Sequence, residues 1–204
     1  MSFMDAGAAV RRRMILAVAA LSLAALSAAC QQTTAAQKPV TPSTRPPLVL
    51  TADSIVLEER YPAPGEQPGE ERNLALTPAG AVRDWVKTCL RADGTPGQIR
   101  VILLDARVTR KELAVQKGLK GAFSDDQKYR YDGHLHLRVE YNPVSGSRPS
   151  SYAEAEARAF FTVPEGASVN QLEQQSTAMV RDLMLRLELE LENNMLRYMP
   201  GVLR

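Results

Sequence analysis

The side chains most able to do chemistry in this sequence are its two histidines, His134 and His136. On a β-strand, residues two apart project from one face, which would also carry Asp132 and Glu140. Imidazole and carboxylate groups on one face could hold a zinc ion or exchange protons. A tight metal site needs further convergent ligands, and the chain has no other histidine. We therefore expect a solvated polar strand face without a metal site, and no stoichiometric Zn²⁺ binding in equilibrium dialysis.

The second reactive group is the thiol of Cys89, because a cysteine near a histidine can act as a nucleophile. Cys89 shares an apolar stripe of helical spacing with Trp85 and Val86. A thiol buried in apolar surroundings has low reactivity. We therefore expect an inert core cysteine that a thiol reagent labels slowly in the native protein.

Motifs of known catalytic chemistry are absent from the sequence. It has no nucleophile elbow, phosphate-binding loop or dinucleotide fingerprint, and Gly118 and Gly121 lack the flanking strand and helix that such a loop requires. Nothing in the sequence places two glutamates across a cleft, as glycoside hydrolysis would need. We therefore expect a protein without enzymatic activity or a cofactor. An envelope hydrolase is the contrary hypothesis, and it would need a nucleophile or a metal.

The first 29 residues have the organisation of an export signal. Arg11, Arg12 and Arg13 precede an apolar run, residues 14–29, that ends in small residues. An uncleaved membrane anchor is the alternative, but the run is shorter than the roughly 20 apolar residues that span a bilayer. The arginine pair before the run is also compatible with twin-arginine export, whereas the absence of a cofactor motif favours the Sec route.

The stretch Leu26-Ser27-Ala28-Ala29-Cys30 resembles the lipobox of bacterial lipoproteins, although that family usually has Leu at the position of Ser27. The resemblance implies that Cys30 is diacylated and becomes the mature N-terminus, with plain secretion as the alternative. Gln31 after the cysteine implies sorting to the outer membrane. Residues 30–47 are rich in Gln, Thr, Ala and Pro without an aromatic residue, which predicts a disordered tether before a globular domain at residues 48–204.

The net charge excludes one class of partner. The chain has 25 Lys and Arg against 23 Asp and Glu, and three of the basic and one of the acidic residues lie in the first 29. The remainder therefore has 22 of each, and a neutral, exported domain is not expected to bind nucleic acid. Membrane attachment is expected from acyl chains on Cys30 and not from a basic surface.

Hydrophobic periodicity predicts the elements in the first half of the globular part. Residues 49–61 have apolar side chains on one parity, which favours a strand, and residues 62–73 have the Pro, Gly and Glu of a loop that adds nothing to a core. Thr77 and Pro78 predict the start of a helix with Gly94 as its C-cap. Residues 99–108 are apolar on both parities and predict a central strand. Residues 109–127 permit no assignment.

The second half predicts a hairpin followed by a long helix. Residues 129–141 alternate between apolar and charged side chains, as a strand with one buried face does. Residues 153–161 alternate Ala with Glu and Arg, and this period of two favours a return strand although Ala and Glu are good helix formers. Ser168 and Gln171 form a capping box, from which an apolar stripe runs to Pro200 over about 45 Å.

These elements predict an α+β two-layer sandwich, with a four-stranded, largely antiparallel sheet, two helices on one face and the order β-α-β-β-β-α. The pattern resembles small envelope lipoproteins, such as the lipopolysaccharide-assembly lipoprotein and the auxiliary lipoproteins of ABC-type lipid transporters. Cys30, the capped helix around Trp85 and the amphipathic strand from Tyr129 carry this resemblance. Residues 97–108 are also similar to a stretch of uncharacterised alphaproteobacterial lipoproteins.

The leading expectation is a non-enzymatic lipoprotein, anchored in the outer membrane and facing the periplasm, that acts as an accessory or assembly factor. It would bind another envelope protein or a lipid through residues 109–127 or through the second half of the last helix, at Leu185, Leu189, Leu196 and Met199. The alternative is a binding module for a small amphiphile held between the helices and the sheet. That alternative needs a cavity beside the alanines of residues 153–159.

Overall fold

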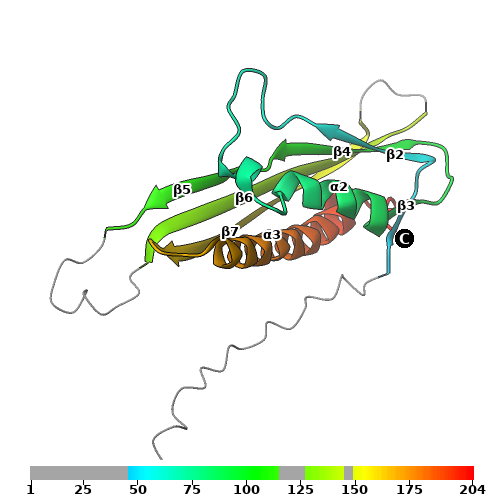
Figure 1. Ribbon diagram of the computed structural model, residues 1–204. Helices are drawn as coiled ribbons and strands as arrows, with labels where there is room; N and C mark the ends of the chain where they lie inside the picture. Colours follow the sequence, from blue (N-terminus) through cyan, green and yellow to red (C-terminus); the bar gives the residue numbers. More distant parts are fainter. Residues whose placement is uncertain (1–45, 115–126, 145–148) are drawn as a thin grey trace, which may run out of the picture. The chain divides into compact units, whose positions relative to one another are not determined.

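The computed structural model describes residues 46–114, 127–144 and 149–204 (Figure 1). The predicted export signal, Cys30 and nearly all of the predicted tether lie outside these residues. The strands are β1 (Leu48–Leu50), β2 (Ser54–Glu59), β3 (Leu90–Ala92), β4 (Gln98–Asp105), β5 (Val108–Glu112), β6 (Gln127–Asn142) and β7 (Ser151–Pro164), and the helices are the 3-10 helix η1 (Glu70–Asn73), α2 (Pro78–Cys89) and α3 (Val169–Tyr198).

Among the described residues the main sheet has five strands, so the predicted number of four is wrong, whereas the predicted α+β class is confirmed. β2 pairs with β4 in parallel, whereas β4, β5 and β7 all pair with β6 in an antiparallel manner. β4 and β5 form one row, because β4 lies beside the second half of β6 and β5 beside the first half. The predicted strand at residues 99–108 is interrupted where the register shifts between Leu103 and Asp105. The chain becomes extended again in β5, whose mostly polar residues do not alternate with apolar ones.

The predicted strand at residues 49–61 is two strands in two sheets. β1 pairs with β3 in a separate two-stranded sheet, whereas β2 joins the main sheet. The predicted C-cap at Gly94 is also wrong, because the chain becomes extended at Leu90 directly after α2 and pairs with β1. The helix start is confirmed, since the side chain of Thr77 accepts a hydrogen bond from the backbone N–H of Gly80 (3.0 Å).

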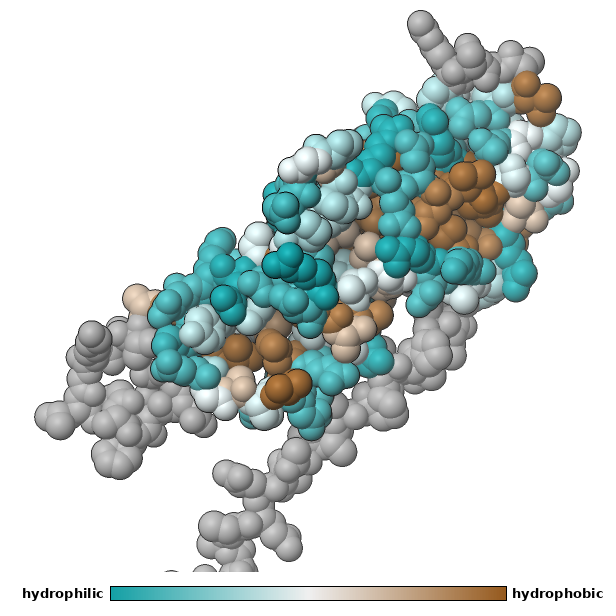
Figure 2. All heavy atoms as spheres, turned by 45° about the horizontal axis from the view of Figure 1, so that its top comes forward, coloured by the Kyte–Doolittle hydropathy of each residue, from teal (hydrophilic) through white to brown (hydrophobic). Residues whose placement is uncertain are grey.

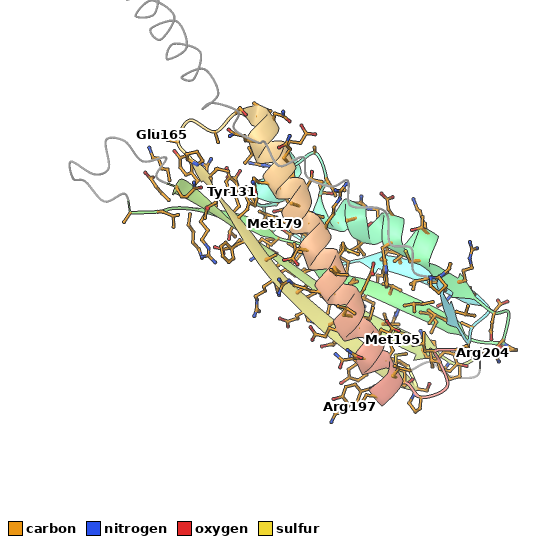
Figure 3. All side chains as sticks on the ribbon, turned by 90° about the horizontal axis from the view of Figure 1, so that it is seen from below. Tyr131, Glu165, Met179, Met195, Arg197 and Arg204 are labelled. Carbon is orange, nitrogen blue, oxygen red and sulfur yellow. The ribbon has the colours of Figure 1, made fainter. Side chains whose placement is uncertain are left out.

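Both helices cover one face of the main sheet, as predicted (Figures 1 and 3). α3 crosses β6 and β7 closely because the strand residues under it are small. Ala153, Ala155 and Ala157 are at most 3% exposed. A Cβ added at Gly133 would lie only 2.9 Å from Leu183 Cδ1. The opposite face of the sheet has no helix over it among the described residues, so its side chains form an open surface.

The described residues contain no helix that combines the length and the apolar character needed to cross a bilayer. The capping box at the start of α3 is confirmed, because the Ser168 and Gln171 side chains each bond to the other residue's backbone N–H. α3 therefore begins where the sequence predicts. It runs for 30 residues along the sheet.

Candidate functional site

The open face of the sheet brings the two histidines next to glutamates of β7. His134 and His136 lie on β6 opposite Arg158 and Glu156, and Glu154 is the next residue on the same face of β7. All of these side chains are partly accessible to solvent. The predicted polar strand face is therefore present, and β7 adds a second row of charges to it.

Each imidazole is held by carboxylates from other strands. His134 Nδ1 lies 2.9 Å from Asp105 Oδ2, and His134 Nε2 lies 3.3 Å from Glu156 Oε2. His136 Nε2 lies 3.5 Å from Glu154 Oε2. The hydrogen bond from His134 and the nearby positive charges lower the pKa of Glu156 below its usual value. In the described part of the chain, no three His, Cys, Asp or Glu side chains converge as ligands of one metal ion.

Glu140 differs from the prediction, because it is buried on this face instead of solvated. Its carboxylate accepts a hydrogen bond from Arg100 Nη2 (2.5 Å), and Arg138 Nε lies 3.3 Å from its other oxygen. A buried carboxylate needs such partners, since an unpaired buried charge costs several kcal/mol. The alternation of apolar and polar residues in the sequence does not show that Arg100 and Arg138 cover Glu140.

A shallow hollow of about 390 Å³ lies on the open face where β5, β6 and β7 meet. Arg107, Arg130 and Arg158 line it, and each forms an ion pair, with Glu66, Asp132 and Glu156 respectively. The guanidinium of Arg130 also lies over the exposed ring of Phe160, 3.8 Å from its centre. Figure 2 shows a mainly hydrophilic surface with separate apolar patches. Because its arginines already have counter-charges, the hollow does not form a strong site for an anionic ligand.

Cys89 is half-buried at the end of α2, so the predicted core position of this thiol is confirmed only in part. Its side chain packs at the margin of the core, and its Sγ lies 3.5 Å from Thr88 Oγ1. The helix ends at this residue, which leaves the last turn less covered than Trp85. The sheet separates Cys89 from His134 and His136, because α2 covers the face opposite the histidines. No thiol–imidazole pair for nucleophilic catalysis results.

Glu71 is a buried carboxylate in the segment that the sequence predicts to be a loop outside the core. It accepts hydrogen bonds from the Tyr61 hydroxyl (2.5 Å) and from the backbone N–H groups of Gly69 (2.7 Å) and Val108 (2.8 Å). Two effects raise the pKa of Tyr61 to about 12: the burial of its hydroxyl, which is the larger, and the hydrogen bond to Glu71. Glu71 thereby fastens the loop to the start of β5. Three glutamates in a Pro- and Gly-rich stretch contain no signal that would single out this one.

The predicted partner surface on α3 is present in part. Leu185, Leu189 and Leu196 are 53%, 41% and 59% exposed. Met199 is only 1% exposed, so its assignment to this surface is wrong. The chain leaves the helix at Met199 and turns the side chain into the core, which the helical spacing up to that residue could not show. Of the second predicted surface, residues 109–112 form the exposed strand β5, and residues 115–126 lie outside the described residues.

Comparisons with known proteins find similarity only at the level of solved structures. No protein-family model matches the sequence, and no curated protein matches it significantly. The chain is similar to the crystal structure of a Xanthomonas campestris protein of the DUF330 family, with 10% identity and a TM-score of 0.31, over 76% of this chain and 89% of that one. A likeness of this size implies nothing about activity.

Proposed function

We propose that this chain is a non-enzymatic lipoprotein of the bacterial envelope that acts as an accessory or assembly factor. Acyl chains on Cys30 would hold it on the periplasmic side of the outer membrane, and residues 30–47 would tether the α+β domain. The domain would bind another envelope protein through the outer side of α3. The lipobox-like segment supports the anchor, and the exposed leucines support the binding role.

The observation that carries this proposal is the alignment of Leu185, Leu189 and Leu196. Steps of four and seven residues return to the same side of an α-helix, so the three side chains lie in one row. The core-facing residues Leu183, Leu187 and Leu191 are at most 1% exposed. α3 is therefore apolar on two sides, of which its own domain covers one. An amphipathic helix that presents a row of apolar anchors is a common way to dock into a partner's groove.

The charges beside this row favour a protein over an anionic lipid surface. Arg181, Arg186, Glu190 and Arg197 are exposed on α3, and Asp182, Glu188 and Glu192 are partly exposed, so both signs border the leucines. Binding to an anionic membrane surface favours a predominantly basic helix face. Mixed charges instead suit a partner with complementary charges of both signs at the rim of a groove.

The amphiphile-binding alternative has less support. Its cavity would lie between α3 and the alanines of β7, but Ala153, Ala155 and Ala157 are buried under the helix. The two hollows described on this domain lie elsewhere, one on the open sheet face and one beside Tyr152 and Tyr198. Close helix packing occupies the space that the ligand would need.

Site-specific photo-crosslinking in intact cells tests the proposed surface. A photoreactive amino acid at Leu189 should crosslink one defined envelope protein, whereas the same group at Gln175, exposed earlier on α3, should not. In an affinity-tagged chain, Leu189→Glu should abolish recovery of that protein from detergent-solubilised envelopes. Unchanged recovery from the Leu189→Glu chain, or identical crosslinks from both positions, would refute a binding role for the leucine row.

A further inference from the structure

We propose that the outer edge of β7 pairs with β7 of a second copy of this chain. The two strands would run antiparallel about a two-fold axis at Ala157, so that one continuous sheet crosses the dimer. This interface is separate from the leucine row of α3 and from the proposed envelope partner. It goes beyond the proposed function, because it concerns how the domain assembles with itself.

The first observation is that the backbone of β7 has an open side. β7 is one edge of the main sheet and pairs only with β6, whereas β2 and β5 lie along the other edge. The carbonyl oxygen of Glu154 points away from β6, because Asn194 Nδ2 of α3 donates to it at 2.7 Å. In an antiparallel ladder the N–H and C=O of one residue point to the same side, and alternate residues point to opposite sides. Glu156, Arg158 and Phe160 therefore also turn their backbone groups outward, as do Tyr152 and Thr162.

The second observation is that this edge, apart from the Asn194 contact at Glu154, lacks the usual protection against pairing. Exposed edge strands are commonly short, bulged or interrupted by Lys or Pro. β7 has 14 residues without a lysine, and its single proline is its last residue, Pro164. Its register with β6 is regular from Arg130 to Tyr141. Of the two strands along the other edge, β2 has only six residues and ends in Glu58 and Glu59, and β5 has five residues that include Lys111.

The third observation is that the edge is complementary to itself. When Ala157 lies opposite Ala157 of the second copy, Glu156 lies opposite Arg158 of that copy, and Arg158 opposite its Glu156. The side chain of Arg158, which pairs with Glu156 of its own strand (3.0 Å), is 75% exposed and could pair with Glu156 of the second copy instead. If one strand slides by two residues relative to the other, the two copies of Glu156 or the two copies of Arg158 lie opposite each other. Like charges directly opposite each other are destabilising. The charges thus disfavour both of these neighbouring registers.

The side chains on the helix side of the same register are small. Ala157 faces its own copy there, and Ala155 faces Ala159, so only small side chains meet beside the buried face. In this register the outward backbone groups of Glu156 form hydrogen bonds with those of Arg158 in the second copy. The two copies of Ala157 therefore form a non-hydrogen-bonded pair. The Cα atoms of such a pair lie about 4.5 Å apart, within the range that a disulfide spans.

Disulfide trapping in the full chain tests the register. Ala157→Cys should give a covalent dimer under mild oxidation of isolated envelopes. Ala155→Cys is the matched control, because the two copies of residue 155 would be about 13 Å apart along the strands. We expect at least tenfold less dimer from the control. Equal yields from both variants, or no dimer from Ala157→Cys, would overturn the proposal.

Charge reversal tests the same interface without a new cysteine. Light scattering on the purified full chain in detergent should show a dimer. Arg158→Glu should raise its dissociation constant about tenfold or more, because each Glu156 then faces a glutamate. The swapped chain with Glu156→Arg and Arg158→Glu should regain the dimer, and Arg72→Glu, far from β7, should keep it. A monomeric wild-type chain, or an Arg158→Glu chain that dimerises equally well, would refute the interface.

Discussion

The buried carboxylate of Glu71 offers the sharpest test of how the loop before α2 is held. Replacement of Glu71 by Ala removes the acceptor for the Tyr61 hydroxyl and for the N–H groups of Gly69 and Val108. We expect the domain to keep its fold and to lose much of its stability.

The magnitude follows from which donors lose their partner. The N–H of Val108 is buried, so it loses its acceptor without gaining water, at a cost of about 1–3 kcal/mol. Gly69 is partly exposed and the Tyr61 hydroxyl can rotate, so these two add a smaller amount. The sum is about 2–4 kcal/mol, a large share of the roughly 5–15 kcal/mol that stabilises a typical domain. Glu71→Gln should cost about 1–2 kcal/mol, because one oxygen remains while its amide NH₂ faces a donor.

Urea unfolding followed by the fluorescence of the single tryptophan, Trp85, measures these differences. Glu70→Ala is the control, since Glu70 is the neighbouring carboxylate and its contacts with Asn73 (3.3 Å) and Arg110 (3.8 Å) are at the surface. We expect it to change the free energy of unfolding by less than about 0.5 kcal/mol. If Glu71→Ala unfolds at the same urea concentration as Glu70→Ala, the assignment of Glu71 as a buried anchor is wrong.

Three further predictions follow from burial, charge and the anchor. Met199→Ala should destabilise the domain by about 2–4 kcal/mol, whereas Leu196→Ala should cost less than about 1 kcal/mol; equal midpoints in urea would contradict this contrast. The lowered pKa of Glu156 stabilises the folded state above the usual value of 4.5, and this contribution is lost as pH falls through the folded pKa. Unfolding midpoints measured from pH 6 to pH 3 should therefore fall less steeply for Glu156→Gln, and parallel curves would exclude this role. Cys30→Ser should release the protein from sedimented membranes, whereas 1 M salt should not, and release of the unaltered chain by salt would point to an electrostatic attachment.

The strands that alternate in polarity were the most predictable part of the fold. The strands predicted at residues 129–141 and 153–161 correspond to β6 and β7. The helix starts at Thr77 and Ser168 were also predictable, because capping depends on residues three or four apart. These signals are local, so they survive without knowledge of the rest of the chain.

The errors concern residues whose surroundings come from distant segments. β1 pairs with β3 although 42 residues separate Leu48 from Leu90 in register. Glu71 is buried by its contact with β5, and Glu140 is covered by Arg100 from the neighbouring strand. Met199 turns inward only after the helix has ended. In each case burial results from packing between segments, which periodicity along one segment does not report.

The class of the domain, the polar face of β6 and the leucine row of α3 are predictable from the sequence alone, because each depends on a repeat within one element. The sequence also contains the export-signal pattern and Cys30, on which the proposed location rests. Only the tertiary structure decided that the histidines are held by carboxylates, that Met199 belongs to the core and that β7 is an open edge. The physical reason is that hydrogen bonds, ion pairs and exposure depend on which segments become neighbours when the chain folds.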